Sequence, residues 1–223
     1  MTISKNPKKI QELFDVIAEK YDFNNNIISL GLHKTIKFLS LKNLEIKNGA
    51  KILDECTGTG DITGLIKKIN LDVEITGIDF SRNMLAGAKN KFPSVTFIQA
   101  DCTNLPFENE TFDIITMTFG LRNIEDYNKA LQETFRVLKS GGEFLHLDFG
   151  EKNFFSKIFD TLVPPLIKLF YGKNLPYAYL LESKKEFPTP DKLIEIFKSH
   201  GFKLKCRKDF LFGIISSQIM QKP

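Results

Sequence analysis

The residues best suited to chemistry form a glycine-rich turn behind a short apolar run. Residues 50–54 read AKILD, and the stretch 56–61 that follows contains Gly58 and Gly60. Glycines in such a turn let the backbone approach a ligand closely. A nucleotide-like cofactor binds at the carboxyl ends of parallel strands, where such turns lie. The sequence therefore predicts a cofactor-binding turn at 56–61.

Two acidic residues follow the next two strand-like runs. Asp79 ends the run 74–79, about 20 residues beyond the glycines, where an acid can hold ribose hydroxyls. Asp101 follows the run 95–99, where an adenine amino group would lie. Together with the glycine turn, these acids match one adenosyl ligand lying across the strand ends. The alternative is an ordinary turn between strand and helix, with Asp79 capping the helix.

The spacing of the glycines separates two classes of cofactor. A dinucleotide-binding turn has the pattern G-x-G-x-x-G. Here Gly58 and Gly60 are followed by Thr63, and the next glycine is Gly64. The displaced third glycine argues against a nicotinamide enzyme. Asp79 alone does not decide between these cofactors, because nicotinamide enzymes and S-adenosylmethionine (SAM) enzymes both use an acid at this position.

Alternating strands and helices must position these groups. Runs typical of strands occupy 50–54, 74–79, 95–99, 112–118 and 143–149, and helical patterns occupy 62–69, 81–91 and 126–138. We expect Ser140-Gly141-Gly142 to end the last of these helices. Strands separated by helices indicate an α/β fold with a parallel sheet and helices on both faces.

Further elements are expected on both sides of this core. Before it, we expect a helix within 8–17, a polar break at 21–26 and a second helix carrying His33, Ile36, Phe38 and Leu41. After it, we expect an apolar helix from 154 that breaks at Pro164-Pro165, helices at 177–185 and 190–200, and strands at 202–210 and 213–220. Gly213 between the two strands indicates a hairpin, and hence an antiparallel edge on the sheet.

Length and composition exclude several classes of protein. The chain has 223 residues, of which 42% are hydrophobic and 26% charged, as in an ordinary soluble domain. A net charge of +4 does not suggest a nucleic-acid partner. Three widely spaced cysteines lack metal-ligand spacing and fit a reduced, cytoplasmic interior. We expect neither a signal peptide nor a membrane span.

Several short motifs resemble class I SAM-dependent methyltransferases. They are Gly58-Thr59-Gly60-Asp61, Gly77-Ile78-Asp79-Phe80-Ser81, Leu105-Pro106-Phe107 and Phe112-Asp113. This resemblance implies a Rossmann-like, mostly parallel sheet with SAM as the cofactor. It also implies the cofactor-binding residues Asp54, Gly58, Thr59, Gly60, Asp79, Phe80, Asp101, Cys102 and Thr118.

Further motifs narrow the resemblance. They are Tyr21-Asp22, Ser29-Leu30-Gly31-Leu32-His33, Phe119-Gly120-Leu121-Arg122-Asn123, Arg136-Val137-Leu138-Lys139 and Tyr179-Leu180 with Glu182-Ser183. On these the chain is similar to the UbiE/MenG family of quinone-biosynthesis C-methyltransferases, which methylate a ring carbon of demethylmenaquinol or of a ubiquinol precursor. It departs from the family pattern at Leu211 and Gln218, where threonine and histidine are usual. Two alternatives stay open: another small-molecule methyltransferase, and a non-catalytic SAM-binding subunit.

Four residues are the catalytic candidates. Arg122 follows the fourth strand, beside the expected cofactor cleft, where a guanidinium can stabilise a developing phenolate. Its alternative is a surface ion pair with Glu125 or Asp126. Tyr21 and Asn123 are candidates for hydrogen bonds to ring oxygens, although Asn123 also suits a helix cap. His33 is either a base in the ring pocket or a packed helix residue.

The chain reads as one methyltransferase domain with four parts: an entry segment at 1–49, a SAM-binding core at 50–150, an apolar substrate lid at 151–190, and a last helix with a hairpin at 191–223. The expected partner is a prenylated quinol, whose tail needs an apolar groove. Segment 151–185 also carries lysines, including Lys157, Lys168 and Lys173, that suit an anionic membrane surface. A lid that packs on the domain, or on a second copy in a homodimer, is favoured over this membrane contact. A cytoplasmic location is expected, with contact at the inner face of the membrane left open.

Overall fold

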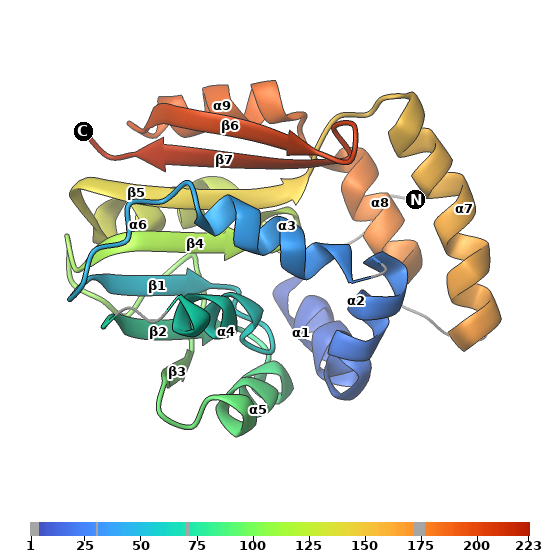
Figure 1. The fold of residues 1–223 in the computed structure, drawn as a ribbon, viewed down its shortest axis with the longest axis horizontal. Coiled ribbons are helices and arrows are strands. Elements are labelled where there is room, and N and C mark those ends of the chain that lie inside the picture. Colours follow the sequence, from blue (N-terminus) through green and yellow to red (C-terminus); the bar gives the residue numbers. More distant parts are fainter. Residues whose placement is uncertain (1–4, 30, 70–71, 172–176) are drawn as a thin grey trace.

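The computed structural model describes residues 5–29, 31–69, 72–171 and 177–223. At its centre is a seven-stranded sheet of order β3-β2-β1-β4-β5-β7-β6 (Figure 1). The strands are β1 (Lys51–Glu55), β2 (Glu74–Asp79), β3 (Thr96–Gln99), β4 (Phe112–Thr118), β5 (Leu138–Phe149), β6 (Lys203–Phe210) and β7 (Ile215–Gln221). The first five pair in parallel, and β7 pairs antiparallel with β5 and β6. The predicted α/β sheet with an antiparallel edge hairpin is confirmed.

The order of the strands reverses between β1 and β4. After β1 the chain builds β2 and β3 on one side, and it then crosses over to build β4 and β5 on the other. In open parallel sheets, the crevice outside the carboxyl ends at such a reversal is the usual ligand site. The glycine turn follows β1 directly. The fold therefore places this turn at the crevice.

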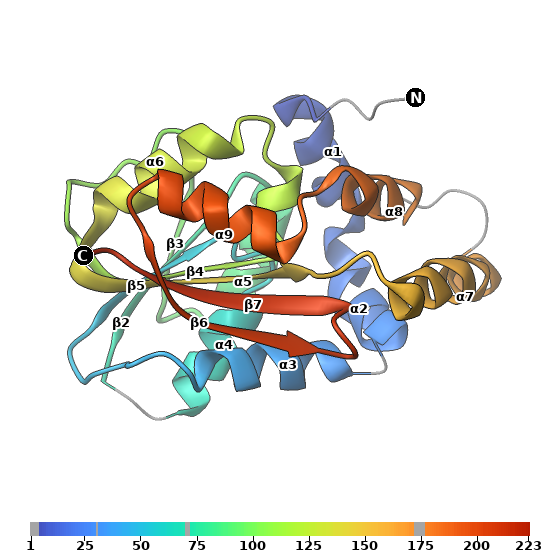
Figure 2. The same cartoon turned by 90° about the horizontal axis from the view of Figure 1, so that it is seen from above.

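Helices cover both faces of the sheet. α6 (Tyr127–Val137) and α9 (Pro190–Ser199) lie on one face, and α3 (Leu32–Leu41) and α4 (Asp61–Lys68) lie on the other (Figure 2). α5 (Arg82–Lys91) packs against β3. The predicted N-cap of α5 is confirmed, because the Ser81 hydroxyl accepts a hydrogen bond from the Met84 N–H at 3.1 Å.

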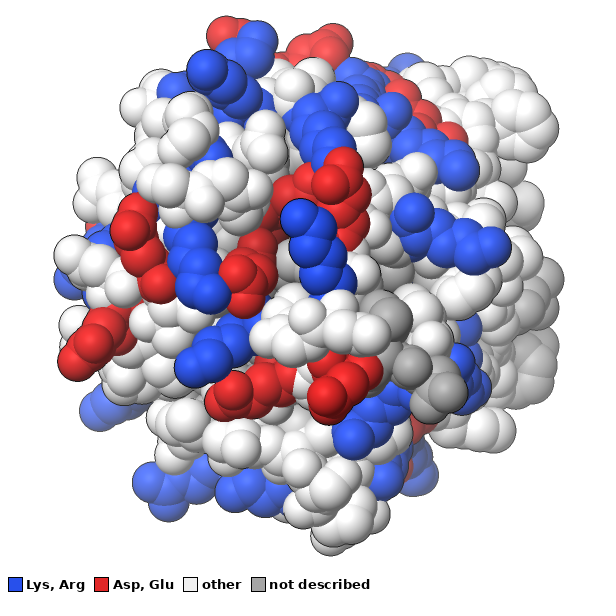
Figure 3. All heavy atoms as spheres, turned by 60° about the vertical axis from the view of Figure 1, so that its left-hand side comes forward, with Lys and Arg blue, Asp and Glu red and all other residues white. Residues whose placement is uncertain are grey.

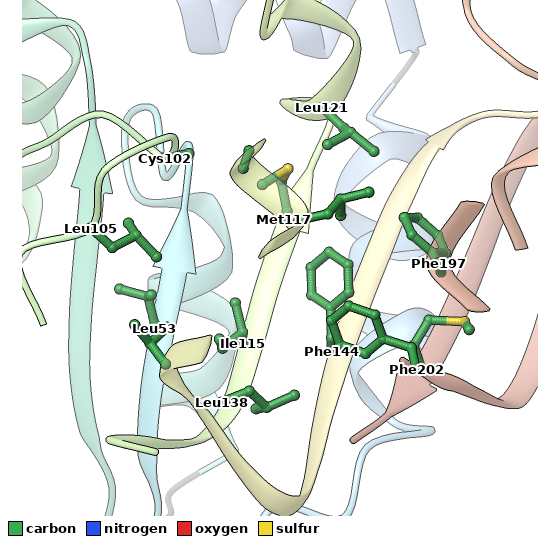
Figure 4. Close-up of a cluster of buried hydrophobic side chains, with 14 of the residues drawn as sticks. Leu53, Cys102, Leu105, Ile115, Met117, Leu121, Leu138, Phe144, Phe197 and Phe202 are labelled. Carbon is green, nitrogen blue, oxygen red and sulfur yellow. The ribbon is translucent and has the colours of Figure 1, made fainter. Parts of the chain in front are cut away.

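A large hydrophobic cluster packs the sheet against α6 and α9 (Figure 4). Leu53, Ile115 and Phe144 project from three neighbouring strands and are fully buried. The ring of Phe144 lies 5.8 Å from that of Phe197 in α9 and 5.6 Å from that of Phe202. Burying a side chain of this size stabilises the fold by about 1.5–3 kcal/mol. This packing fixes the strands whose ends carry the cofactor turn and the acids.

Four further helices gather beyond the carboxyl ends of the parallel strands, on the right of Figure 1. They are α1 (Pro7–Ile17), α2 (Tyr21–Ser29), α7 (Phe154–Tyr171) and α8 (Tyr177–Glu186). Two of them come from the start of the chain and two from its last third. Segments far apart in sequence therefore close the same end of the sheet.

The polar break predicted at 21–26 is wrong, because these residues begin α2. Asn24 is buried, and the Asp22 carboxylate accepts a hydrogen bond from the Thr59 hydroxyl at 2.5 Å. Contacts with the rest of the fold outweigh the weak helix propensity of a run of asparagines.

Two other predicted breaks are also wrong. β5 begins at Leu138, so Ser140-Gly141-Gly142 lies inside the strand. The Gly141 N–H donates to the carbonyl of Lys222 at 2.8 Å, and this pairing with the end of the chain extends β5. α7 continues through Pro164-Pro165. Each proline removes a backbone donor and crowds the preceding turn, so the helix continues here at a local cost in stability.

An apolar surface joins α7 to the turn between β6 and β7. Its exposed side chains are Phe154, Phe155, Ile158, Leu162, Leu211 and Phe212. The rings of Phe155 and Phe212 stack with their centres 4.5 Å apart. Phe154 and Phe212 are 70% and 76% exposed. Leu211 and Phe212 also have positive φ, a strained backbone conformation for residues other than glycine.

Positive and negative charges are mixed on the side of the molecule away from α7. On the face in Figure 3, Lys and Arg side chains alternate with Asp and Glu side chains. This mixture agrees with the small net charge of +4. Among the residues that the structure describes, no helix combines the length and the apolar character needed to cross a membrane.

Candidate active site

A cavity of about 280 Å³ opens at the strand reversal, and we call it the strand-tip cavity. Six of the nine predicted cofactor residues line it: Gly58, Asp79, Phe80, Asp101, Cys102 and Thr118. They lie at or just beyond the ends of four different strands, β1 to β4, and α1 contributes Ile10 and Phe14 to the same wall. The structure thus brings together residues that the sequence spaces over 60 positions.

Asp79 is held by two backbone donors. Its Oδ2 accepts a hydrogen bond from the Gly58 N–H at 2.8 Å, and its Oδ1 accepts one from the Ser81 N–H at 2.9 Å. Burial raises the pKa of Asp79 to about 6, although these backbone bonds act in the opposite direction. Each carboxylate oxygen has a second lone pair, so Asp79 can still accept hydrogen bonds from a ligand hydroxyl.

The glycine turn leaves its backbone open to the cavity at Gly58. This residue has a φ of +58°, and a Cβ placed on it would meet only the Tyr21 ring, at 3.9 Å. Gly60 differs, because a Cβ there would lie 3.0 Å from the Phe92 ring. Gly58 therefore leaves space for a ligand, whereas Gly60 allows close packing behind the turn.

Three predicted cofactor residues do not line the cavity: Asp54, Thr59 and Gly60. The Asp54 carboxylate accepts hydrogen bonds from the hydroxyls of Thr57 at 2.6 Å and Thr116 at 2.7 Å. Burial raises the pKa of Asp54 to about 6. These residues fix the turn from behind, and sequence spacing alone did not separate them from the residues in the wall.

Strained backbone marks both sides of the strand reversal. Cys56, directly after β1, has a φ of 54°, and Phe119, directly after β4, has a φ of 58°. A Cβ on Gly120 would lie 2.6 Å from the Cβ of Cys56, so the two turns pack backbone against side chain. Strain of this kind persists where the surrounding structure enforces it, often at functional sites. Sequence analysis gave Phe119 no role.

A second cavity, of about 170 Å³, lies among the helices, and we call it the helix-lined cavity. Its wall is mostly apolar and includes Ile17, Ile36, Phe149 and Phe159. All four predicted catalytic residues line it: Tyr21, His33, Arg122 and Asn123. The residues Phe14, Tyr21, Phe119 and Asn123 line both cavities, so the two cavities adjoin.

Arg122 is buried, with 5% of its surface exposed. Its Nη1 donates to Asp148 Oδ1 at 2.6 Å and to the Phe119 carbonyl at 2.9 Å. Its Nε has no hydrogen-bond partner among the described residues. The surface ion pair with Glu125 or Asp126 is therefore wrong. Asp148, which sequence analysis left without a role, is the partner.

Asn123 links two parts of the wall. Its Nδ2 donates to the Phe119 carbonyl at 3.1 Å, and its Oδ1 accepts from the Tyr179 hydroxyl at 3.1 Å. The cap of the following helix is Asp126, so the capping alternative for Asn123 is wrong. Burial raises the pKa of Tyr179 to about 12, which keeps this phenol protonated. Tyr179 was noted only as part of a motif.

His33 is buried at the wall of the helix-lined cavity. Its Nδ1 lies 2.6 Å from the Ser29 hydroxyl, whereas its Nε2 has no hydrogen-bond partner among the described residues and lies 3.6 Å from Asp61 Oδ2. Burial, and then the nearby charge of Lys37, lower the pKa of His33. The ring is therefore neutral at pH 7, as a base requires.

The strand-tip cavity suits an adenosyl compound such as SAM. Asp79 supplies acceptors for ribose hydroxyls, Gly58 exposes backbone, and Phe80 with Met84 adds apolar wall. The volume of about 280 Å³ is close to the roughly 300 Å³ at which small-molecule sites begin. The residues present therefore fit this cofactor.

Comparisons with known proteins agree with this geometry. A model of the ubiE/COQ5 methyltransferase family matches residues 1–222. The demethylmenaquinone methyltransferase of Staphylococcus haemolyticus (strain JCSC1435) is 38% identical over 226 residues, which cover 96% of this chain and 94% of the relative. The protein of that name from Anoxybacillus flavithermus is 33% identical, over 97% of this chain and 96% of the relative.

Solved structures with lower identity share the fold. A SAM-dependent methyltransferase from Thermotoga maritima has a TM-score of 0.74 at 16% identity, over 96% of this chain and all of that chain. Phosphoethanolamine N-methyltransferase 2 of Haemonchus contortus in complex with SAM has a TM-score of 0.67 at 18% identity, over 85% of this chain and 52% of that chain.

Proposed function

The chain belongs to the ubiE/COQ5 methyltransferase family, and from this premise we propose that it methylates a ring carbon of a prenylated quinol, with SAM as the methyl donor. A substrate of the demethylmenaquinol type is favoured by the names of the relatives. One observation carries the proposal: the two cavities adjoin at Tyr21, Phe119 and Asn123. A donor in the first cavity and an acceptor in the second would meet there.

Methyl transfer to carbon makes three demands on the protein. SAM, when bound, supplies an electrophilic methyl group on its sulfonium. A quinol ring carbon beside an ionised hydroxyl uses its electron pair to form the new carbon–carbon bond, while the sulfur–carbon bond breaks. The methylated carbon then loses its proton to a base. The chain must therefore align the reactants, stabilise the ring oxyanion and accept that proton.

Arg122 is the group proposed to stabilise the ring oxyanion. Asp148 and the Phe119 carbonyl hold the guanidinium through Nη1, which leaves the Nε donor uncommitted among the described residues. A guanidinium remains charged at any relevant pH. A preorganised donor of this kind acts strongly on charge that develops in the transition state.

His33 is the group proposed to accept the proton. Its Nε2 carries no hydrogen bond among the described residues, and Ser29 holds the other ring nitrogen. Because the pKa of His33 is lowered by burial, the ring is neutral and able to take up a proton. Tyr21 and Asn123, at the boundary of the cavities, are proposed to orient the ring.

We also propose that the apolar surface rests on an anionic lipid bilayer while segment 151–185 covers the prenyl tail. Leu211 belongs both to this surface and to the wall of the helix-lined cavity, which gives the tail a continuous apolar path. The neighbouring acids Asp160 and Glu151 are neutralised by Lys184 and Arg207. Exposed Lys157 is then free to meet anionic lipid.

The test is a product analysis. Purified protein is incubated with SAM carrying a ¹³C methyl group and with a short-chain demethylmenaquinol kept reduced. We expect a product one methyl heavier, with the label on a ring carbon by NMR. The Asp79→Ala variant is the control for transfer that depends on the strand-tip cavity. A label on oxygen, or SAM binding without any product, would contradict the proposal and favour another methyltransferase or a non-catalytic subunit.

A further inference from the structure

Lys37 is a buried cation to which sequence analysis gave no role. Its side chain is 8% exposed and lines the helix-lined cavity. Its ammonium donates one hydrogen bond, to Asp61 Oδ2 at 2.9 Å. An ammonium carries three N–H donors. Within the described residues, this one bond leaves two donors uncommitted beside a mostly apolar wall.

A charge buried in this way is costly unless it is paired. Burial is the largest influence and acts to lower the pKa of Lys37, but the charge and hydrogen bond of Asp61, together with Tyr21 and Asp54, outweigh it and the pKa is raised. Lys37 therefore stays charged at neutral pH. A link between α3 and α4 could be made at the surface, and it does not explain why the ammonium reaches the cavity wall.

Arg122 and Lys37 are arranged in the same way. The Lys37 Nζ lies 6.0 Å from the centre of the Phe119 ring, and the Arg122 Cζ lies 5.7 Å from the same centre. Each cation is held by a carboxylate, Asp61 or Asp148, that does not line the cavity. The helix-lined cavity thus has two positive charges in its wall, both near the Phe119 ring. The two carboxylates that pair with them do not line the cavity.

We propose that Lys37 and Arg122 bind the two oxygens of a 1,4-dihydroxy aromatic ring, with Lys37 holding the oxygen that Arg122 does not. The proposal rests on the proposed function and adds the second oxygen-binding group of its acceptor site. An oxygen in each position gives each buried cation an acceptor. The same pair of cations disfavours a ring with one free hydroxyl, because one cation then loses its acceptor.

Two monomethyl ethers of the short-chain quinol test this assignment. One ether blocks the hydroxyl whose ionisation activates the ring carbon, and it is the reference for lost chemistry. The other blocks only the oxygen assigned to Lys37, and it is the informative substrate. The proteins are wild type, Lys37→Arg, and Lys37→Met combined with Asp61→Asn, so that no bare carboxylate remains. Lys34→Met, an exposed lysine on the same helix, is the matched control.

Wild type and Lys34→Met should use the informative ether about 10- to 100-fold less well than the free quinol in kcat/KM, the scale of one lost charged hydrogen bond. Lys37→Met/Asp61→Asn should lose this discrimination while retaining turnover of the quinol at a raised KM. Lys37→Arg should restore it. Calorimetry with SAM reports whether each variant is folded.

Two results would overturn the assignment. One is a wild-type protein whose kcat/KM for the informative ether equals its kcat/KM for the free quinol. This result can be obtained without any variant. The other is a double variant that binds SAM normally and keeps the wild-type discrimination. Failure of the proposed function looks different, because wild type would then methylate neither the quinol nor an ether.

Discussion

The strand-tip cavity and the helix-lined cavity are built in different ways. In the first, Asp79 ends β2, while Gly58 and Asp101 lie on the turns just after β1 and β3 of one sheet. In the second, α1 to α3, α7 and α8 supply much of the wall, whereas Arg122 and Asn123 come from the turn after β4, and the charged groups depend on partners far away in sequence. Arg122 pairs with Asp148, and Lys37 pairs with Asp61.

This difference indicates a division of labour. We expect the sheet to supply the cofactor site through backbone donors and strand-end acids, a solution available to any enzyme with this fold. We expect the added helices to complete the acceptor site around Arg122 and Asn123 and to make the reaction specific. Changes in the first cavity should therefore alter SAM affinity, and changes in the second should alter turnover and substrate choice.

The largest expected effect comes from Arg122→Ala combined with Asp148→Asn. The second substitution removes a carboxylate that would otherwise stay buried without a partner, at a cost of about 3–5 kcal/mol. Turnover should fall by about two to three orders of magnitude, the scale of losing one preorganised donor. Quenched time courses with labelled SAM measure the rate of methyl transfer. Near-normal turnover would reduce Arg122 to a structural ion pair.

Arg122→Lys is the conservative companion. Lysine keeps the charge but lacks the planar fork that reaches Asp148 and the Phe119 carbonyl together. We expect only partial recovery of turnover. Full recovery would mean that charge alone matters at this position.

Asp79→Ala should act on the other cavity. The ribose hydroxyls of SAM would lose their acceptor, and the Gly58 N–H would lose the bond that fixes the glycine turn. SAM affinity should fall about 10- to 100-fold, as expected for hydrogen bonds to a charged group. Calorimetry measures this loss. Unchanged affinity would remove Asp79 from the cofactor site.

The pH dependence of SAM binding separates Asp79 from Asp54. Both have a pKa raised to about 6 by burial, but only Asp79 lines the cavity. Ligand hydroxyls donate to an ionised carboxylate, so protonation below pH 6 should weaken SAM binding by up to about tenfold per pH unit. Asp79→Asn should abolish this dependence and Asp54→Asn should keep it. If Asp54→Asn abolished the pH dependence and Asp79→Asn kept it, the titrating acid would be Asp54, behind the turn.

The smallest expected effect concerns the apolar surface. Phe154→Ser with Phe212→Ser should weaken binding to vesicles of anionic phospholipid by about three- to tenfold, because less apolar area is buried. Leu204→Ser, an exposed apolar residue near the start of β6, is the matched control. Sedimentation with vesicles measures the change. Equal vesicle binding by all variants would contradict the membrane assignment. So would a double variant that changes a homodimer into a monomer, because the apolar surface would then be a dimer interface.

Sequence analysis located the sheet and most of the predicted residues that line the strand-tip cavity, because both depend on local patterns. Apolar runs bounded by glycine or an acid identify strand ends, and strand ends meet in space. The predicted residues that do not line the cavity, such as Asp54, lie within a few positions of residues that do. Spacing does not show which side chains on a turn point outward.

The acceptor site was harder to predict because its contacts are long-range. Nothing near Arg122 indicates Asp148, which lies 26 residues away, and nothing near Lys37 indicates Asp61. The polar run 21–26 folds into a helix whose first turn is bonded to the glycine turn, through Asp22 and Thr59. Such pairings arise from tertiary structure, which overrides local propensity.

The division of labour is tested most directly by titrating SAM into Arg122→Ala/Asp148→Asn by calorimetry and measuring methyl transfer in the same preparation. The account predicts a SAM affinity within about threefold of wild type, since an indirect effect across adjoining cavities is below about 1 kcal/mol, together with turnover lowered at least 100-fold. A parallel loss of SAM affinity and turnover would contradict it, because Arg122 would then shape the cofactor site and the two cavities would not act separately.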